Sequence, residues 1–403
     1  MLAIALAACS QPTNGTAPPP GLSNRAGSGA PVLEDPAEHS TAEAVGWADG
    51  HAIVVGSAGL TEATPSGANP ITVDGARYHG WIRAVDDHGD LGWTRRLDAG
   101  REVHARAVAA AGGDLVIAGE YRAGDTRAYT GWVARLAPGG AERWRLEGLG
   151  EPGVTGLEAV AVRGDGTVVA GGMQHGTAWL VAIDGHGKLA WQRPVAGLDE
   201  VTAVMAAPGD AGGVGGGAGA IVAGVTGRTT TSAGTSRLVA IDAGGAPRWS
   251  TEAAEHGHGE LFAIAPLADG GGVAVGQAPG GDGGDGAWIV RFAADGTLRS
   301  HQVVATPGSA AARAVAATGD GGFLVAGEVL DGPGRRGRLW RFDAAGALVW
   351  QQAYGAGEAR LLGVAATPDG GAVAVGTIQT AGVTLRPWIL GVDRRGAQRW
   401  TGH

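Results

Sequence analysis

Residues 361–402 read LLGVAATPDGGAVAVGTIQTAGVTLRPWILGVDRRGAQRWTG, and this stretch predicts the fold. Two apolar runs, 361–367 and 372–377, flank a Pro-Asp-Gly-Gly turn sequence. A third run covers 388–393, and the segment 398–401 follows after Arg-Arg-Gly. Asp and Gly tolerate the positive φ of tight hairpins. Three turn signals between four short β-prone runs therefore indicate an antiparallel meander of four strands.

The same phrase recurs seven times along the 403-residue chain. Each copy has a glycine shortly before the end of its unit, and these glycines are Gly89, Gly140, Gly187, Gly245, Gly296, Gly346 and Gly396. A period near fifty residues, with strand signals in every unit, is typical of repeat architectures in which neighbouring units bury each other's apolar faces. We therefore predict an all-β fold, a seven-bladed β-propeller of four-stranded antiparallel blades.

The repeat also predicts the domain boundaries. Residues 10–39 are rich in Pro, Gly, Ser and Asn and read as a disordered tether, whereas 40–403 form the propeller. The blades are expected at about 40–99, 100–150, 151–197, 198–254, 255–306, 307–355 and 356–403. The first unit begins with its first strand and the last unit ends with its fourth. The simplest ring therefore closes blade against blade, without a strand borrowed from the other terminus.

Composition argues against two classes of partner. The net charge is −9 and Lys188 is the only lysine among 30 basic residues, with no basic run in the chain. Phosphate backbones require clustered Lys and Arg, so we expect no nucleic-acid partner. The sequence has no apolar stretch of the length that a membrane-spanning helix needs.

Tryptophans recur twelve residues apart in four of the units. The pairs are Trp81/Trp93, Trp132/Trp144, Trp179/Trp191 and Trp388/Trp400. Folding each hairpin at the midpoint would place the two rings opposite each other, where an aromatic pair contributes roughly 0.2–1 kcal/mol. The same rule places Arg237 against Trp249 and Arg338 against Trp350, as cation–π contacts. Because the spacing recurs around the ring, we interpret these tryptophans as structural rather than as a ligand-stacking set.

The N-terminus resembles a bacterial lipoprotein signal. Cys9 is the only cysteine, and it follows Leu6, Ala7 and Ala8 at the end of an apolar run. The resemblance implies that residues 1–9 form a signal peptide ending at a lipidated cysteine, and Ser10 after it implies an outer-membrane lipoprotein, periplasmic or surface-exposed. The cationic start of such signals is missing, which leaves open whether Met1 is the true start. An unmodified cysteine is the alternative.

The segments Ala182-Ile183-Asp184…Gly187-Lys188-Leu189-Ala190-Trp191 and Arg341-Phe342-Asp343…Gly346-Ala347-Leu348-Val349-Trp350 resemble the tryptophan-docking repeat of pyrroloquinoline-quinone-type propellers. The whole repeat is also similar to glycine-rich propeller repeats of bacterial surface lipoproteins. A quinone dehydrogenase would imply calcium held partly by Asn and Glu, often beside a vicinal cysteine pair. Here the asparagines are only Asn14, Asn24 and Asn69, and no cysteine follows Cys9. We therefore expect no cofactor and no metal.

One face of the expected disc carries most of the sequence variation, in the connections between strands two and three and between consecutive blades. Variable loops on one face of a repeat scaffold are typical of a binding face. The residues just inside the inner strands at this face form a candidate ligand ring at the mouth of the axial channel: Glu43, Arg106, Glu158, Thr202, Phe262 and Arg313, with Leu362 at the equivalent place in the last unit. Solvated ion pairs around a water-filled channel mouth are the alternative.

These observations favour a non-catalytic, monomeric, lipid-anchored binding or scaffold module of the bacterial cell envelope. It would recognise a protein or a glycan through the variable-loop face and meet the membrane only through its lipid. The alternative is an envelope enzyme, a hydrolase or lyase using Glu43, Arg106, Glu158 and Arg313. Carboxylates with shifted pKa values converging in a deep axial pocket would favour the enzyme. An exposed apolar patch among the loops would favour the binding module.

Overall fold

The computed structural model describes residues 38–60, 78–97, 102–122, 128–207, 219–227, 234–253, 259–280, 284–304, 306, 308–332, 334–379 and 385–402. Cys9 and the predicted signal segment lie outside the described residues, as does most of the predicted tether 10–39. Within the described ranges every regular element is a β-strand. The search of these residues for a helix able to cross a membrane found none.

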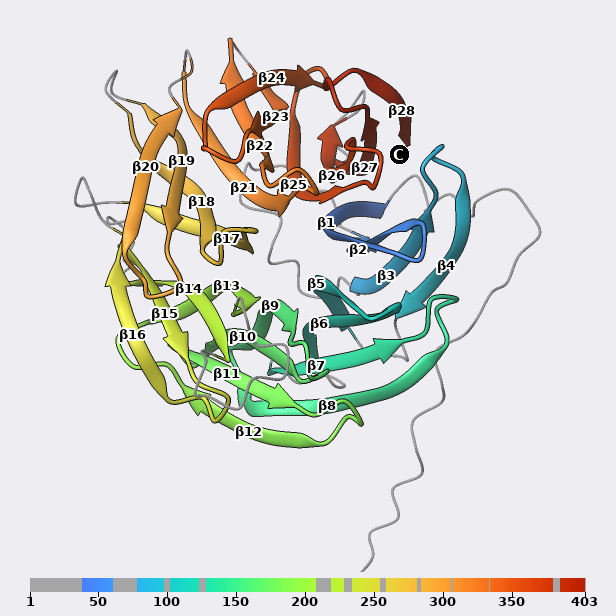
Figure 1. The fold of residues 1–403 in the computed structure, drawn as a ribbon. Coiled ribbons are helices and arrows are strands. Elements are labelled where there is room, and N and C mark those ends of the chain that lie inside the picture. The colour runs from blue at the N-terminus through green and yellow to red at the C-terminus, as the bar shows by residue number, and fades with distance from the viewer. Residues whose placement is uncertain are drawn as a thin grey trace, which may run out of the picture.

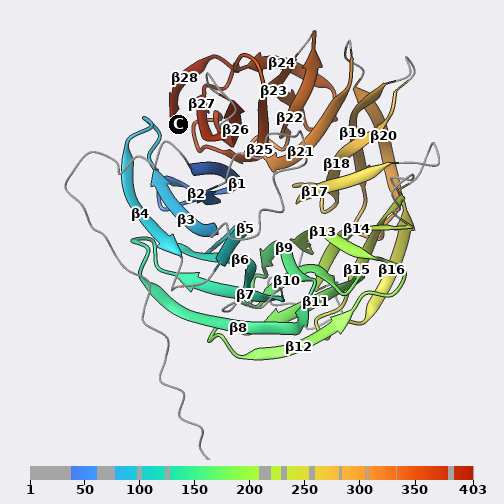
Figure 2. The same cartoon turned by 180° about the vertical axis from the view of Figure 1, so that it is seen from behind.

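The strands form seven four-stranded antiparallel sheets that radiate from a common axis, as Figures 1 and 2 show from opposite sides. The prediction of a seven-bladed propeller is confirmed. The blades are β1 (Glu38–Ala48), β2 (His51–Leu60), β3 (Tyr78–Val85) and β4 (Leu91–Leu97); β5 (Glu102–Ala111), β6 (Asp114–Arg122), β7 (Tyr129–Leu136) and β8 (Glu142–Gly153); β9 (Thr155–Val162), β10 (Val168–Gln174), β11 (Thr177–Ile183) and β12 (Leu189–Pro194); β13 (Glu200–Ala206), β14 (Ala220–Thr226), β15 (Thr235–Ile241) and β16 (Pro247–Glu252); β17 (Glu260–Pro266), β18 (Gly272–Pro279), β19 (Asp285–Phe292) and β20 (Leu298–Val304); β21 (Ala310–Ala317), β22 (Phe323–Asp331), β23 (Gly334–Phe342) and β24 (Leu348–Tyr354); β25 (Ala359–Ala366), β26 (Ala372–Gln379), β27 (Leu385–Val392) and β28 (Gln398–Gly402).

The ring closes blade against blade. In the described part of the chain, each sheet consists of four consecutive strands, so the terminal blades share no strand. The inner strand β1 instead packs against β25, β26 and β27 of the last blade. Val45 and Val54 of the first blade lie in one buried cluster with Val373 and Val375 of the last. The first and last blades are therefore joined by side-chain packing rather than by a backbone ladder in the described part of the chain.

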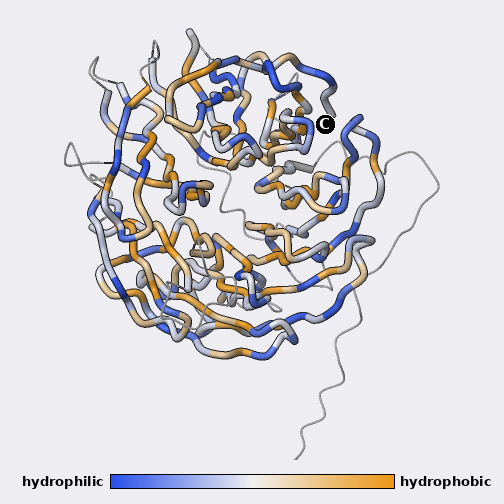
Figure 3. Tube along the Cα trace, in the orientation of Figure 1, coloured by the Kyte–Doolittle hydropathy of each residue, from blue (hydrophilic) through white to orange (hydrophobic). Residues whose placement is uncertain are grey.

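The core lies between neighbouring blades. Each second strand is apolar along its length because both of its faces are covered, and Val54, Val116, Val222 and Val325 are fully buried there. Figure 3 shows the hydrophobic colour concentrated on the inner and middle strands and the hydrophilic colour along the outer ones. The outer strand β12 (Leu189–Pro194), for example, is mostly exposed. Largely apolar second strands and polar outer strands follow from this layering.

The tryptophan pairs do not face each other, which corrects the predicted geometry. Trp81 stands opposite Arg96, and Trp93 stands opposite Ala84. The same offset separates the other pairs: Trp132 faces Glu147, Trp144 faces Arg135, Trp179 faces Pro194, Trp191 faces Ala182, and Trp400 faces Gly391. Arg237 faces Glu252 and Arg338 faces Ala353, so the proposed cation–π pairs with Trp249 and Trp350 are also wrong.

The predicted pairing of the tryptophans is wrong because it placed the centre of the hairpin too early in the chain. The turn of the first blade occupies residues 86–90, and the register slips between Ala84 and Val85. Its centre therefore lies later in the chain than the midpoint between the two tryptophans. Because successive side chains alternate between the faces of a sheet, this shift places the two rings on opposite faces.

The two tryptophans of a blade consequently contact different neighbours. Third-strand tryptophans are buried against the preceding blade, as Trp132 is in the cluster of the first and second blades. Fourth-strand tryptophans donate their indole N–H to a turn carbonyl of the following blade. These bonds join Trp93 to Pro138 (3.1 Å), Trp144 to Gly185 (3.2 Å), Trp191 to Ala243 (2.9 Å), Trp249 to Ala294 (3.1 Å), Trp350 to Arg394 (3.1 Å) and Trp400 to Asp87 (2.8 Å).

The fifth blade makes the same connection without a tryptophan. Ser300 stands where the other blades have the fourth-strand tryptophan, opposite Arg291. Arg291 donates from Nη1 to the carbonyl oxygen of Ala345 at 2.6 Å, and Gln302 donates to that of Gly346 at 3.0 Å. Long polar side chains can therefore replace the indole as the donor between blades.

Candidate functional site

A β-bulge on each inner strand positions the side chains of the axial ring. The register of the inner strand slips at the same place in every blade, for example between Ala105 and Ala107. The extra residues at these slips are Glu43, Arg106, Glu158, Thr202, Phe262, Arg313 and Leu362. A bulge leaves its extra residue out of the ladder and changes where the side chain points. All seven predicted ring positions are thus bulge residues.

A glycine on the second strand makes room for each bulge. These glycines are Gly56, Gly119, Gly172, Gly224, Gly276, Gly327 and Gly376. A Cβ atom at Gly276 would lie 1.7 Å from the carbonyl oxygen of Glu260, and one at Gly224 would lie 2.4 Å from that of Glu200. No side chain fits at such a distance, so the repeated glycine near the end of the second strand is a packing requirement of the bulge.

A pocket of about 890 Å³ lies at the axial ends of these strands. Its walls are the first residues of β1, β5, β9, β13 and β25, the last residues of second strands such as Thr377, and the first residues of third strands such as Tyr78. Those ends belong to the face that carries the variable connections. The pocket therefore opens on the face whose connections vary most among the repeats, which is the face predicted to bind a ligand.

The structure divides the predicted ring into two halves. Glu43, Arg106 and Glu158 line the pocket, together with Leu362. The other three members, Thr202, Phe262 and Arg313, contact other groups of the protein. Thr202 donates its hydroxyl to the carbonyl oxygen of Leu261 at 2.7 Å.

In that second half, the Arg313 guanidinium lies 4.4 Å from the ring centre of Phe262. It also binds Glu328, with 2.8 Å between Nη2 and Oε1. The protein itself therefore supplies both a charged hydrogen bond and an aromatic ring to this cation.

Arg106 holds the polar wall of the pocket together. It donates from Nε and Nη2 to Oε1 of Glu120, at 3.0 and 2.7 Å. Its Nη1 lies 3.9 Å from Oε1 of Glu43, which accepts the hydroxyl of Thr41 at 2.5 Å. Burial opposes the charge of Arg106, but the carboxylates of Glu120, Glu158 and Glu43 outweigh burial and raise its pKa.

Glu158 carries the most perturbed carboxyl group of the pocket. Its side chain is exposed to the pocket, so a ligand can reach the carboxyl group, although protein surrounds this part of the axis. Burial raises its pKa, Arg106 opposes the shift, and Glu120, Glu200 and Glu43 add to it, giving a value of about 7. Crowding of like charges and desolvation thus keep Glu158 partly protonated at neutral pH.

A second cluster, built around Glu102, forms another wall and was not predicted. Oε1 of Glu102 accepts the Tyr129 hydroxyl at 2.7 Å and lies 3.2 Å from Nε2 of His104, while Arg122 pairs with its other oxygen. Burial opposes the charge on Glu102, but the bonds from His104 and Tyr129 and the charge of Arg122 lower its pKa overall. The imidazole of His104 lies between two rings, 5.3 Å from Tyr78 and 6.1 Å from Tyr129 between centroids.

The sequence contains a partial signal for this cluster. Glu102 and His104 precede Arg106 at a spacing of two, which puts all three on one face of the strand β5. Tyr129 and Arg122 come from neighbouring strands, and their place beside Glu102 depends on the pairing of β5 with β6 and of β6 with β7.

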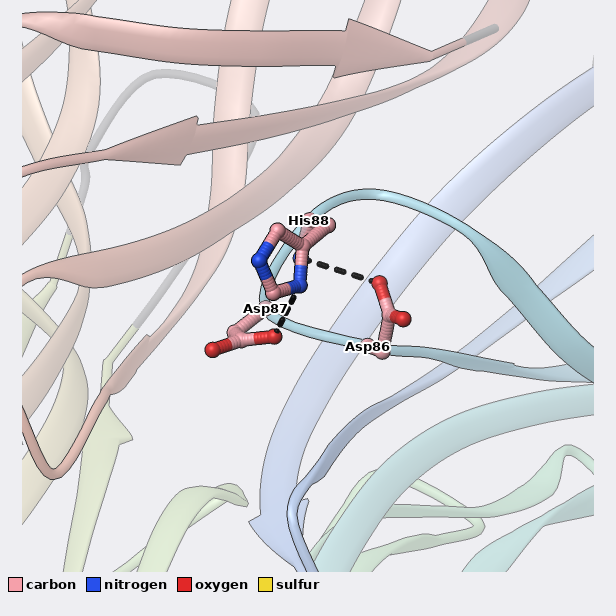
Figure 4. Close-up of side chains that lie close together, drawn as sticks. All are labelled: Asp86, Asp87 and His88. Carbon is pink, nitrogen blue, oxygen red and sulfur yellow. Dashed lines mark hydrogen bonds and ion pairs between the residues drawn. The ribbon is translucent and has the colours of Figure 1, made fainter.

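Among the described residues, one group of three side chains has the spacing of metal ligands: Asp86, Asp87 and His88 in the turn between β3 and β4 (Figure 4). Oδ1 of Asp86 accepts the backbone N–H groups of His88 and Asp90, at 2.9 and 2.8 Å. Asp184 and Asp393 accept the same pair of bonds in the turns of other blades. The hydrogen bonds of the turn therefore account for the closeness of these three side chains. The turn lies on the face of the propeller opposite the pocket.

No model of a known protein family matches this chain, and no curated protein matches its sequence. The WD40 domain of Pan2 from Neurospora crassa is similar in structure, with 11% identity, coverage of 85% of this chain and 91% of that chain, and a TM-score of 0.50. A protein of unknown function from Dyadobacter fermentans matches at 11% identity over 88% and 94% of the two chains, with a TM-score of 0.50. The β-propeller domain of the trilobed protease from Pyrococcus furiosus matches at 8% identity over 87% and 93%, with a TM-score of 0.47.

Identities this low show a shared fold alone, because propellers with unrelated functions have the same architecture. The resemblances to quinone-type repeats and to surface lipoproteins stay predictions.

Proposed function

We propose that this propeller is a non-catalytic binding module of the bacterial cell envelope. It recognises a protein or a glycan on the face formed by the connections between second and third strands and between blades. The observation that carries the proposal is the pocket of about 890 Å³ that opens on this face at the axis. A ring of paired strands supports the pocket, and rigid scaffolds with variable loops are the usual setting for recognition.

Exposed apolar side chains on the same face support recognition of a partner. Val154, which lines the pocket, is 64% exposed, and Leu330 at the end of β22 is 41% exposed. Burying such side chains in an interface contributes roughly 25 cal/mol per Å² of apolar area. Val349 is similarly exposed, at 60%, but lies near a turn of the opposite face and offers a matched control position.

The membrane anchor is a separate part of the proposal. Cys9, after Leu6, Ala7 and Ala8, carries the lipid, and the segment 10–39 tethers the propeller to the outer membrane. A flexible chain of about thirty residues would have a mean reach of about 30 Å, at ~5–6 Å × √n. Cys9→Ala should move the protein from the membrane fraction to the soluble fraction of the cell envelope and abolish labelling with radioactive palmitate. Unchanged membrane association of this variant would contradict the anchor.

Photo-crosslinking in the bacterium that produces the chain tests the recognition face. A photoreactive amino acid at Leu330 should yield a discrete adduct, whereas the same substitution at Val349 should not. Adducts of equal yield from both positions, or from neither, would contradict recognition through the variable-loop face.

The second candidate function is that of an enzyme, because the pocket has the arrangement of carboxylates that we expect of an enzyme. Carboxylates converge in the axial pocket, and the pKa of Glu158 is about 7, in the range of a general acid at neutral pH. Arg313, assigned to the same site from the sequence, instead binds Glu328 in the other half of the ring. Release of new reducing ends from isolated envelope glycans by the native protein, but not by Glu158→Gln, would favour the enzyme.

A further inference from the structure

We propose that the axial pocket binds an organic cation, with its ammonium or guanidinium group among the carboxylates around Glu43 and Glu158 and its carbon body against the tyrosine wall. The inference rests on the proposed function, since it assigns a ligand chemistry to the pocket of the recognition face. A free amine and a Lys or Arg side chain of a partner protein share this chemistry.

The net charge of the groups that line the pocket determines whether the ligand should be a cation or an anion. Its lining has six carboxylates, Glu43, Glu102, Glu120, Glu158, Glu200 and Glu358, and two guanidinium groups, Arg106 and Arg360. Arg106 bonds Glu120, and Arg122 pairs with Glu102 from just outside the lining. Among the described residues that line the pocket, the carboxylates therefore outnumber the guanidinium groups. An anion would be repelled there, and a cation would relieve the repulsion among the carboxylates.

The geometry favours an organic cation over a metal ion. Among the described residues, the pocket has no three carboxylate or imidazole groups whose ligand atoms lie within 4.8 Å of one another, a spacing found only at Asp86, Asp87 and His88. Calcium takes six to eight oxygen ligands at about 2.3–2.6 Å. The volume of about 890 Å³ lies instead in the range of roughly 300–1,000 Å³ that is typical of small-molecule sites.

The rest of the lining suits the carbon body of such a ligand. Tyr78, Tyr129 and Val154 border the pocket, and Gly153, next to Val154, pairs with Tyr129 across the β7–β8 ladder. Aromatic faces attract ammonium and guanidinium groups placed within about 6 Å of the ring centre.

The protein's own arginines already use this combination of groups. Arg313 lies over Phe262 while it bonds Glu328 in the other half of the ring, and Arg122 lies 5.9 Å from the ring centre of Tyr129 while it pairs with Glu102. A ligand cation between Glu43 and Glu158, with its carbon body against the tyrosine wall, would repeat this combination of groups.

Calorimetric titration of the full chain in detergent tests the inference with two isosteric probes, butylguanidine and the neutral butylurea. Butylguanidine should bind at least tenfold more tightly than butylurea. Glu158→Gln should weaken its binding at least tenfold. The control Glu252→Gln, on the exposed outer strand β16, should leave binding unchanged. Glu43→Gln repeats the test if Glu158→Gln does not fold.

Equal affinity for the two probes, no binding of either, or wild-type affinity in a folded Glu158→Gln or Glu43→Gln variant would overturn the inference. Displacement of butylguanidine by an equal concentration of calcium would overturn it in favour of a metal site. Blocked peptides containing arginine or the neutral citrulline identify the source. Tighter binding of the arginine peptide than of butylguanidine assigns the site to a partner's side chain, and the reverse assigns it to a free cation. A Leu330-specific adduct without cation binding would leave the recognition face standing and refute only this inference.

Discussion

The indole Nε1 of Trp400 donates a hydrogen bond to the carbonyl oxygen of Asp87 at 2.8 Å, and this bond joins the last strand of the chain to the turn of the first blade. Five other tryptophans make the same bond between blades that are consecutive in sequence. Only the Trp400 bond connects residues at opposite ends of the chain. Since the terminal blades share no strand in the described structure, the bond and the cluster around Val45 and Val373 join the two ends of the ring.

Trp400→Phe keeps an aromatic ring but removes the donor, so it should lower the free energy of unfolding by about 1 kcal/mol, the net value of one hydrogen bond. Urea denaturation measures the change, with Trp93→Phe as the matched variant at an internal junction. Trp400→Ala should also reduce amide hydrogen-exchange protection first in β1 and β28. A uniform loss of protection around the ring would contradict a special role at the junction.

Gly119→Ala should disturb the bulge that positions Arg106. The added Cβ would lie 2.0 Å from the carbonyl oxygen of His104, so the inner strand must move. Overpacking of this kind costs about 1–3 kcal/mol of unfolding free energy. Gly139→Ala is the control, because a Cβ there meets no atom within 4 Å, and it should change stability by less than about 0.5 kcal/mol. Equal stabilities of the two variants would show that the glycine opposite the bulge is dispensable.

The carboxyl group of Glu158 should make the protein less stable as pH rises. Its pKa is raised from 4.5 in the unfolded chain to about 7, so the folded state binds the proton more tightly. The stabilisation is complete below about pH 4.5 and is lost as pH rises through about 7. Urea midpoints at pH 5 and pH 8 should therefore differ more for the native protein than for Glu158→Gln. The same difference in both proteins would rule out Glu158 as the source.

Asp369 should have the opposite dependence. The Thr367 hydroxyl donates to Oδ1 at 2.6 Å, and Arg399 lies 2.6 Å from Oδ2. The Thr367 bond is the largest influence, and with Arg399 it lowers the pKa from 3.8 to about 2. This stabilisation is present above about pH 3.8 and is lost as pH falls through about 2. Asp369→Asn should flatten the acid limb of a thermal-unfolding profile measured between pH 4 and pH 2. An unchanged acid limb would show that the turn does not depend on the charge.

The strands and the axial positions could be predicted because they depend on short-range patterns. The Asp369-Gly370 turn separates β25 from β26 as expected, and equivalent turns are described at Asp165-Gly166, Asp269-Gly270 and Asp320-Gly321. Glu43, Arg106 and Glu158 were selected from a place just inside the start of inner strands, whereas in the structure they lie near the middle of longer strands, at the bulges. The glycines opposite the bulges were visible as part of the repeat, but the close approach that requires them was not.

Side-chain partners could not be predicted, because they depend on register and on neighbouring strands. A shift in the centre of a hairpin placed Trp81 and Trp93 on opposite faces of one blade, against different neighbours. The bond from Tyr129 to Glu102 joins strands β7 and β5, which are separated by β6 in the same sheet. The bonds from Arg106 to Glu120 and from Arg313 to Glu328 likewise join the first and second strands of a blade.

The sequence by itself determined the number of blades, the order of strands and the face that carries variation, because alternation and turn residues act over a few residues and the repeat of about fifty residues is visible along the chain. The tertiary structure decided which tryptophan joins which blade, which ring residues face open space, and how far Glu158 retains its proton. Those outcomes depend on distances between groups far apart in the chain, and electrostatic and packing energies change steeply with such distances.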